Sequence, residues 1–231
     1  MGVRSGPPAV AGEVLIRQEI IDRVLARRGR LHLYDRLDPE RTALLAIDMQ
    51  NAFVAPGAPI EVPGARAIVP TLNRLAAELR KRGVPVIWVL HQNSGDWANF
   101  FDVFVKPDNR ARAAQALEAG SELQKPWREL DVAPSDVKVT KNRYSALIGQ
   151  SSSLAGVLRE RNIDTLLIAG TKTNVCCECT ARDAMMLDYK VVMLSDCTAA
   201  LSDDEHRATL ENVIQQFGDV LSADEALALV K

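Results

Sequence analysis

Short apolar runs alternate with segments of helical periodicity along most of the 231-residue chain. The runs cover residues 42–48, 84–90, 136–140, 165–169, 190–195 and 219–221, and the helical patterns lie between and after them. Parallel strands that are buried on both faces read as nearly continuous apolar runs, and each needs a crossover, usually a helix, to reach the next strand. The alternation therefore predicts an α/β fold of three layers, α/β/α, around a mostly parallel, six-stranded, doubly wound (Rossmann-like) sheet.

Reactive side chains stand at or just beyond the carboxyl ends of four of these runs. They are Asp48, His91, Lys141 and Cys176. In open α/β sheets the ligand site lies outside the carboxyl ends of the strands, near the point where strand order reverses. We therefore expect a carboxylate, a lysine and a cysteine from three separate strands to share one small cleft.

Composition narrows the classes of protein. Hydrophobic residues make up 47% and charged residues 25% of the chain, which suits one globular domain. The net charge of −2, with both signs interspersed, argues against a nucleic-acid partner. No run has membrane-spanning length, and the N-terminus lacks the pattern of a signal peptide. Four cysteines, three of them clustered, cannot form a disulfide framework that stabilises a chain of this length. We therefore expect reduced cysteines and a cytoplasmic protein.

The chain divides at about residue 40. Residues 1–40 form an N-terminal extension with an amphipathic helix between about Gly12 and Arg28, predicted to pack on the domain or on a neighbouring subunit. Residues 41–231 form the main domain. An apolar stretch from Phe100 to Val105 either covers a neighbour's active site or folds as a lid over its own. These surfaces predict a homodimer or homotetramer.

Three cysteines, Cys176, Cys177 and Cys179, stand where the run 165–169 passes into a predicted helix. Free amides and the helix dipole at such a terminus favour a thiolate, which predicts a lowered pKa and a nucleophilic role for Cys176. Two alternatives stay open. The cysteines are also compatible with small apolar fillers under a helix, and Cys176 with Cys179 has the C-x-x-C spacing of a thiol redox pair.

Asp48 and Lys141 give this cysteine a chemical context. The charge of Lys141 would lower the pKa of the thiol, while Asp48 would accept its proton and later return it to a leaving amine. Considered one at a time, each residue also has a purely structural interpretation. Asp48 also fits the role of a residue that caps a loop, and Lys141 also fits that of a solvent-exposed surface charge. Lys138, in the same run, is a rival for the role of Lys141.

Three segments resemble the isochorismatase-like cysteine hydrolases in content, order and approximate spacing. They are residues 48–53 (DMQNAF), 141–146 (KNRYSA) and 170–176 (GTKTNVC), within a resemblance that runs from about Arg41 to Val230. The resemblance implies a catalytic triad of Asp48 as base, Lys141 as cationic partner and Cys176 as nucleophile. It also implies hydrolysis of a C–N bond in a small linear amide, carbamoyl or ureido acid through a thioester acyl-enzyme, with release of ammonia.

The same resemblance implies a non-proline cis peptide bond between Thr171 and Lys172. That bond would aim the backbone amides of Lys172 and Cys176 at the substrate oxygen as an oxyanion hole. True isochorismatases cleave a vinyl ether, and some lack the cysteine, so the presence of Cys176 favours amide chemistry while vinyl ether hydrolysis remains an alternative. Ala52 replaces a second aspartate that is usual in the family motif, and we expect altered loop support there.

Substrate contacts are predicted at Phe53, His91, Tyr144 and Lys172, although His91 also fits a structural role. Nicotinamidases of this superfamily carry a metal-binding Asp-x-His-x-x-x-His cluster, whereas the loop here offers His91 alone. Histidines scattered at three positions do not make a recognisable metal site, so we expect no metal. No glycine-rich phosphate loop follows the first run, and no organic cofactor is expected. His206 is predicted to lie on a helix surface, and Cys177 to face away from the site.

Overall fold

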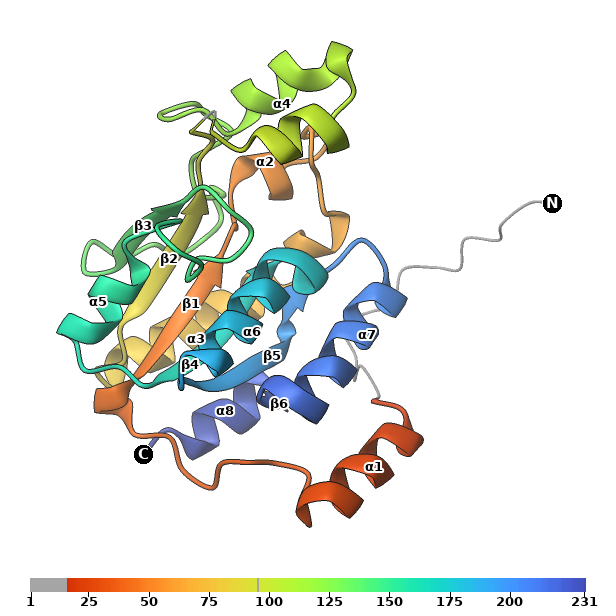
Figure 1. Ribbon diagram of the computed structural model, residues 1–231. Helices are drawn as coiled ribbons and strands as arrows, with labels where there is room; N and C mark the ends of the chain where they lie inside the picture. Colours follow the sequence, from red (N-terminus) through yellow and green to blue (C-terminus); the bar gives the residue numbers. More distant parts are fainter. Residues whose placement is uncertain (1–15, 95) are drawn as a thin grey trace.

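Six parallel strands form the sheet in the computed structural model, which describes residues 16–94 and 96–231 (Figure 1). Their order is β3-β2-β1-β4-β5-β6, so strand order reverses between β1 and β4. The strands are β1 (Thr42–Ile47), β2 (Val86–His91), β3 (Val137–Lys141), β4 (Thr165–Thr171), β5 (Lys190–Ala199) and β6 (Asp219–Leu221). The predicted three-layer α/β/α fold is confirmed.

Helices cover both faces of the sheet (Figure 1). On one face lie α3 (Val69–Lys81) and α8 (Ala223–Leu229), and on the other lie α5 (Leu154–Glu160), α6 (Glu178–Met186) and α7 (Asp203–Asn212). Successive residues of a strand point to opposite faces, so Leu44 and Ala46 join the first core cluster while Leu45 and Ile47 join the second. This two-sided burial explains why the strand runs are apolar throughout.

Shorter elements connect these layers. They are α2 (Asn51–Val54), α4 (Arg110–Ala116), three 3₁₀ turns (Pro39–Arg41, Pro63–Arg66, Pro107–Asn109) and three π-helical turns (Phe100–Phe104, Thr173–Cys177, Val213–Phe217). The segment with α4 projects beyond the carboxyl edge of the sheet (Figure 1). Within the described ranges, no helix combines the length and the hydropathy that crossing a membrane requires.

The described part of the N-terminal extension packs on its own domain. Helix α1 (Gln18–Arg28) buries Ile20 and Val24 in the second core cluster, beside the turn that follows α7. The guanidinium of Arg17 donates to the Glu211 carboxylate at 2.6 and 2.9 Å. The helix begins at Gln18, later than the predicted start near Gly12, and residues 12–15 lie outside the described residues.

Gly170 brings the ends of the two central strands together. Its φ is +110°, and a Cβ atom added there would lie 2.0 Å from the Ile47 carbonyl oxygen. Only glycine fits this approach. The pairing of β4 with β5 shifts register at the same place, and β5 continues to Ala199, four residues beyond its predicted end. As a result, the residue after β1 and the turn after β4 lie at one edge of the sheet.

Candidate active site

Asp48 and Lys141 form a fully buried ion pair at this edge. Asp48 follows β1 with a left-handed φ of 54°, and its amide donates to the Val89 carbonyl at 2.8 Å. Lys141 is the last residue of β3. Its Nζ lies 2.9 Å from Asp48 Oδ2, and both side chains have zero exposure. Lys138 points to solvent on the same strand, so Lys141 is the lysine that the structure brings to Asp48.

The ammonium of Lys141 has two further acceptors. Nζ lies 3.1 Å from His91 Nδ1 and 3.1 Å from the Arg143 carbonyl oxygen. Burial disfavours the charged ammonium, but the negative charge of Asp48, and that of Cys176 once it ionises, more than offset this effect and raise the pKa of Lys141. Lys141 is therefore a cation at neutral pH.

Cys176 lies in the π-helical turn Thr173–Cys177, and α6 begins only at Glu178, so the predicted helix start at Cys176 was wrong. The Cys177 amide donates five residues back to the Lys172 carbonyl at 3.2 Å, which is the bond that widens the turn. Thr180 Oγ1 donates to the Cys176 carbonyl at 2.7 Å and stabilises the same turn. The Thr171–Lys172 peptide bond that precedes it is cis.

The thiol of Cys176 is only 4% exposed, and this burial governs its acidity. Burial and then the negative charge of Asp48 raise the pKa of Cys176 well above its ordinary value, and the charge of Lys141 only partly opposes them. The predicted lowering of this pKa was wrong because the argument from the helix terminus left desolvation out. The resting group is a thiol, so its use as a nucleophile requires a base.

Asp48 has the properties of such a base. Burial raises the pKa of its carboxyl, and the charge of Lys141 works in the opposite direction. Oδ2 accepts from Lys141, while Oδ1 is buried with no hydrogen-bond partner among the described residues. Oδ1 is therefore the oxygen open to a proton from Cys176.

Of the group Asp48, Lys141 and Cys176, Lys141 is directly followed by the segment 142–145, which lines a cavity of about 690 Å³. Its lining includes Trp97, Arg143, Tyr144, Gln150, Cys179 and Arg182, but not the three groups themselves. Tyr144 connects the two regions because it lines the cavity and also packs against the core cluster that contains Cys176. Burial, followed by the proximity of Cys176, raises the pKa of its phenol. Arg143 and Arg182 bring positive charge to the wall, each paired with a carboxylate, Asp96 and Glu178 respectively.

Aromatic side chains border the cavity. The ring of Trp97 stacks on Phe100 at 5.1 Å between centroids and meets Tyr144 edge-on at 4.7 Å. Val103 and Phe104, one turn further along, are 67% and 76% exposed. The apolar stretch thus stacks Phe100 on Trp97 of the cavity wall and leaves Val103 and Phe104 facing solvent.

The structure places the four predicted substrate-contact residues in different surroundings. Tyr144 lines the cavity, whereas His91 is buried against Lys141 and does not line it. Phe53 is 7% exposed and packs in the core cluster on the α3 side of the sheet, away from Cys176. Lys172 is half-buried and does not line the cavity.

Three further residues support the site in ways that sequence reasoning missed or misread. Gln50, inside the DMQNAF segment, holds the backbone of His91 through both atoms of its amide, at 2.7 and 2.9 Å. Thr180 supports Cys176 as described above. His206 is buried, contrary to its predicted place on a helix surface, because its ring bridges Thr173 Oγ1 at 2.8 Å and the Ser195 carbonyl at 3.1 Å.

Cys177 is fully buried, and its Sγ lies 3.8 Å from the Ala169 carbonyl, as expected of a core side chain. Across the described residues, histidine, cysteine and acidic side chains form no group of three or more that could hold a metal ion.

Comparisons with known proteins identify the family and the fold. Residues 42–225 match the model of the isochorismatase domain family. The chain is 30% identical to the ureidoacrylate amidohydrolase RutB of Methylobacterium radiotolerans over 213 residues, covering 84% of this chain and 82% of that protein. It is 33% identical to RutB of Pseudomonas savastanoi over 209 residues, covering 82% and 84%.

A solved structure of a cysteine hydrolase from Pseudomonas syringae superposes with a TM-score of 0.76 at 30% identity, covering 86% of this chain and 96% of that one. The N-carbamoylsarcosine amidase of Thermoplasma acidophilum shares the fold, with a TM-score of 0.65 at 24% identity and coverage of 80% and 97%. The chain belongs to the isochorismatase family of hydrolases.

Proposed function

We propose that the chain is a cysteine-dependent amidohydrolase that cleaves a C–N bond of a small linear amide, carbamoyl or ureido acid and releases ammonia. The observation that carries this proposal is the buried group of Asp48, Lys141 and Cys176, in which a thiol, a carboxylate and an ammonium are electrostatically coupled. Relatives named ureidoacrylate amidohydrolase at 30–33% identity support the amide chemistry.

The first half of the reaction transfers an acyl group to sulfur. Asp48 Oδ1 takes the thiol proton as Cys176 Sγ bonds to the substrate carbonyl carbon, so a free thiolate need not accumulate despite the raised pKa. The positive charge of Lys141 stabilises Asp48 before transfer and the growing negative charge on sulfur and oxygen during it. The amides of Lys172 and Cys176 donate to the oxyanion.

The second half regenerates the thiol. It begins after the tetrahedral intermediate of the first half has collapsed, when the C–N bond has broken, Asp48 has returned its proton to the nitrogen, and the nitrogen has left as ammonia. A water molecule then gives a proton to Asp48 while its oxygen attacks the thioester, and the Cys176 sulfur departs and is reprotonated by Asp48. Each step uses only the chain, the substrate and water.

The cavity supports a small acidic substrate with its reacting end at Cys176. A volume of about 690 Å³ holds a small organic acid with room to spare. Arg143 lies on its wall, over the Trp97 ring at 5.2 Å, and its ion pair with Asp96 spans 3.3 Å with the carboxylate more than half exposed. This pairing leaves the guanidinium able to turn to a substrate carboxylate.

The chain also exposes an apolar surface at the rim of the cavity, which Ile148 and Met186 also line, and we propose this surface as the contact of a homodimer or homotetramer. Ile148, Met186 and Leu187 are 54%, 66% and 53% exposed and line one shallow depression. A contiguous apolar patch of this kind is typical of interfaces.

Ammonia release from a panel of small carboxamide and ureido acids tests the amidohydrolase proposal. The panel includes ureidoacrylate, an N-carbamoyl amino acid and maleamate, with an isochorismate-type vinyl ether for the alternative chemistry. Wild type is compared with Cys176→Ala, Cys177→Ala and Cys179→Ser. We expect turnover of at least one amide, lost in Cys176→Ala and retained in both other variants. Loss in Cys179→Ser to the same extent would favour the thiol redox hypothesis, and turnover of the vinyl ether alone would favour isochorismatase chemistry.

A further inference from the structure

The ammonium of Lys141 has three nitrogen or oxygen acceptors, and it also interacts with the Cys176 sulfur. An ammonium carries three N–H groups, and Nζ lies within 3.1 Å of Asp48 Oδ2, the Arg143 carbonyl oxygen and His91 Nδ1. Because the side chain has zero exposure, a lost acceptor is not readily replaced by bulk water. One of the three bonds that orient this buried cation thus comes from a histidine ring.

Lys141 can only donate, so His91 Nδ1 must accept, and the ring proton must sit on Nε2. Burial, and then the charge of Lys141, lower the pKa of His91 well below its ordinary value, which keeps the ring neutral at working pH. The charged groups that face the ring are Lys141 from β3 and Arg143 from the segment that follows it, and both oppose protonation. Hydrogen bonding with the Asn93 side chain has the opposite but smaller effect.

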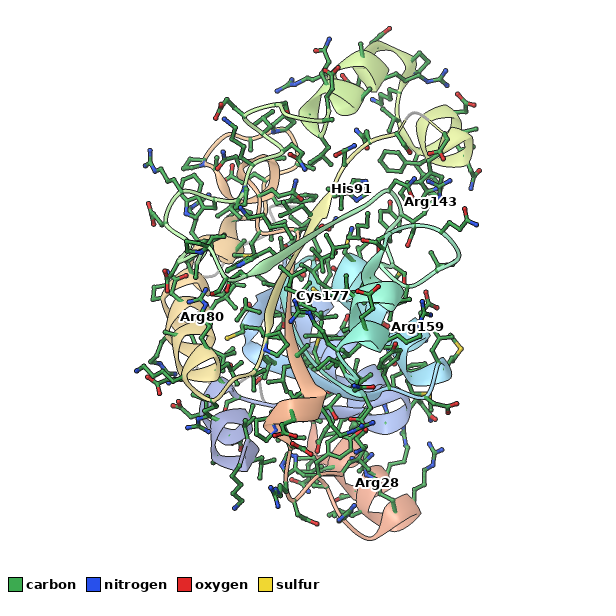
Figure 2. All side chains as sticks on the ribbon, turned by 90° about the vertical axis from the view of Figure 1, so that its left-hand side faces the viewer. Arg28, Arg80, His91, Arg143, Arg159 and Cys177 are labelled. Carbon is green, nitrogen blue, oxygen red and sulfur yellow. The ribbon has the colours of Figure 1, made fainter. Side chains whose placement is uncertain are left out.

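The ring is itself held in place from several sides. His91 ends β2 and pairs in register with Lys141 of β3. Gln50 Oε1 accepts from the His91 amide at 2.7 Å, and Gln50 Nε2 donates to its carbonyl at 2.9 Å. The ring stacks on Trp97 with centroids 6.4 Å apart and planes 22° from parallel. Figure 2 shows His91 and Arg143 at the same end of the sheet.

We propose that His91 is a positioning residue: its Nδ1 accepts the third hydrogen bond of the Lys141 ammonium and so keeps that charge fixed between Asp48 and Cys176. The proposal rests on the proposed function, and it replaces the predicted substrate contact at this position. His91 neither lines the cavity nor touches the reacting atoms. Without it, the ammonium keeps Asp48 and the Arg143 carbonyl as oxygen acceptors, together with its interaction with Cys176, but it loses the one hydrogen bond that joins it to β2 among the described residues and can shift within the site. A shifted ammonium stabilises the negative charge of the transition state less well.

Two variants separate the acceptor from the ring. His91→Phe keeps an aromatic ring against Trp97 but removes the acceptor, whereas His91→Asn places Oδ1 close to where Nδ1 lies. We expect kcat of His91→Phe to fall about 10- to 100-fold with KM changed less than about threefold, because one hydrogen bond to a buried charge is lost. His91→Asn should recover most of that loss. If His91→Phe fails to fold, as judged by circular dichroism, His91→Leu carries the same comparison.

A second readout needs no substrate. The rate of Cys176 alkylation by iodoacetamide, followed by peptide mass spectrometry between pH 6 and 10, reports the charge that acts on the thiol. We expect the profile of His91→Phe to move to higher pH and that of His91→Asn to follow wild type. Wild-type inactivity on every substrate would refute the proposed function, and the alkylation profiles would still decide the role of His91.

Three outcomes would overturn the proposal. The first is wild-type kcat and an unshifted alkylation profile in His91→Phe. The second is equal loss in His91→Asn and His91→Phe. The third is a rise in KM at constant kcat, which would make His91 a substrate contact.

Discussion

Replacing Lys141 with methionine leaves the Asp48 carboxyl fully buried without its counter-ion. The folded protein then accommodates Asp48 mainly in its protonated form. An aspartate has a pKa of about 3.9 in an unfolded chain, and each pH unit above that value costs about 1.4 kcal/mol to keep the group protonated. The cost at pH 7 is about 4 kcal/mol, within the range of about 3–5 kcal/mol known for breaking a buried ion pair.

The sign of the pH dependence follows from the same argument. In Lys141→Met the folded-state pKa of Asp48 lies above the unfolded value, so the penalty is absent below about pH 4 and grows as the pH rises towards the folded-state pKa. Urea unfolding at pH 5, 6 and 7 measures it. The stability of Lys141→Met should fall by about 1.4 kcal/mol per pH unit relative to Asp48→Asn/Lys141→Met, in which no carboxyl remains.

Lys138→Met is the matched control, because Lys138 lies on the same strand but is exposed. It should unfold like wild type. Parallel pH profiles for Lys141→Met and the double variant, or equal destabilisation by Lys138→Met, would refute the reasoning that Asp48 and Lys141 are a coupled buried pair.

Three further predictions follow from other parts of the molecule. Gly170→Ala should destabilise the fold by about 2–6 kcal/mol, because the added methyl group strains the backbone and overlaps with Ile47. Gly156→Ala, at an open position of α5, should instead stabilise the fold by about 0.5–1 kcal/mol. Thermal melting of the two variants beside wild type measures both effects. The apparent pKa of the acid limb of the kcat/KM pH profile should lie above the usual pKa range of an aspartate, because burial raises the pKa of Asp48, which must be ionised to act. An acid limb with an apparent pKa near 4 or below would contradict this. Met186→Glu should shift the chain to a smaller species in sedimentation velocity, while Lys138→Glu should not, and an unchanged distribution would exclude the patch around Met186 as an interface.

The sheet and its order of elements follow from local sequence because burial on both faces leaves a clear signature in each strand run. The carboxyl-end position of Asp48, Lys141 and Cys176 follows from topology alone, since parallel strands all end at one edge. Alternation along β3, together with the match of residues 143–145 to the family motif, favours Lys141 over Lys138.

Other features depend on contacts that no local pattern encodes. The π-helical turn at Cys176 arises where β4 passes close to β1 at Gly170, and the raised pKa of the thiol arises from burial under neighbouring elements. His206 looks like a surface residue in its helix, yet it is buried because Thr173 and Ser195, distant in sequence, meet its ring. The contact of His91 Nδ1 with Lys141 likewise depends on the pairing of β2 with β3, which the residues around His91 do not encode.

Peptide mapping of the quenched reaction tests the central claim most directly. Wild-type protein is mixed with the substrate that releases ammonia fastest, quenched with acid during turnover, digested and analysed by mass spectrometry. We expect an acyl adduct on the peptide that carries Cys176, located on Cys176 itself, and no adduct in Cys176→Ala. Turnover that proceeds without an adduct at Cys176, and that persists in Cys176→Ala, would contradict it.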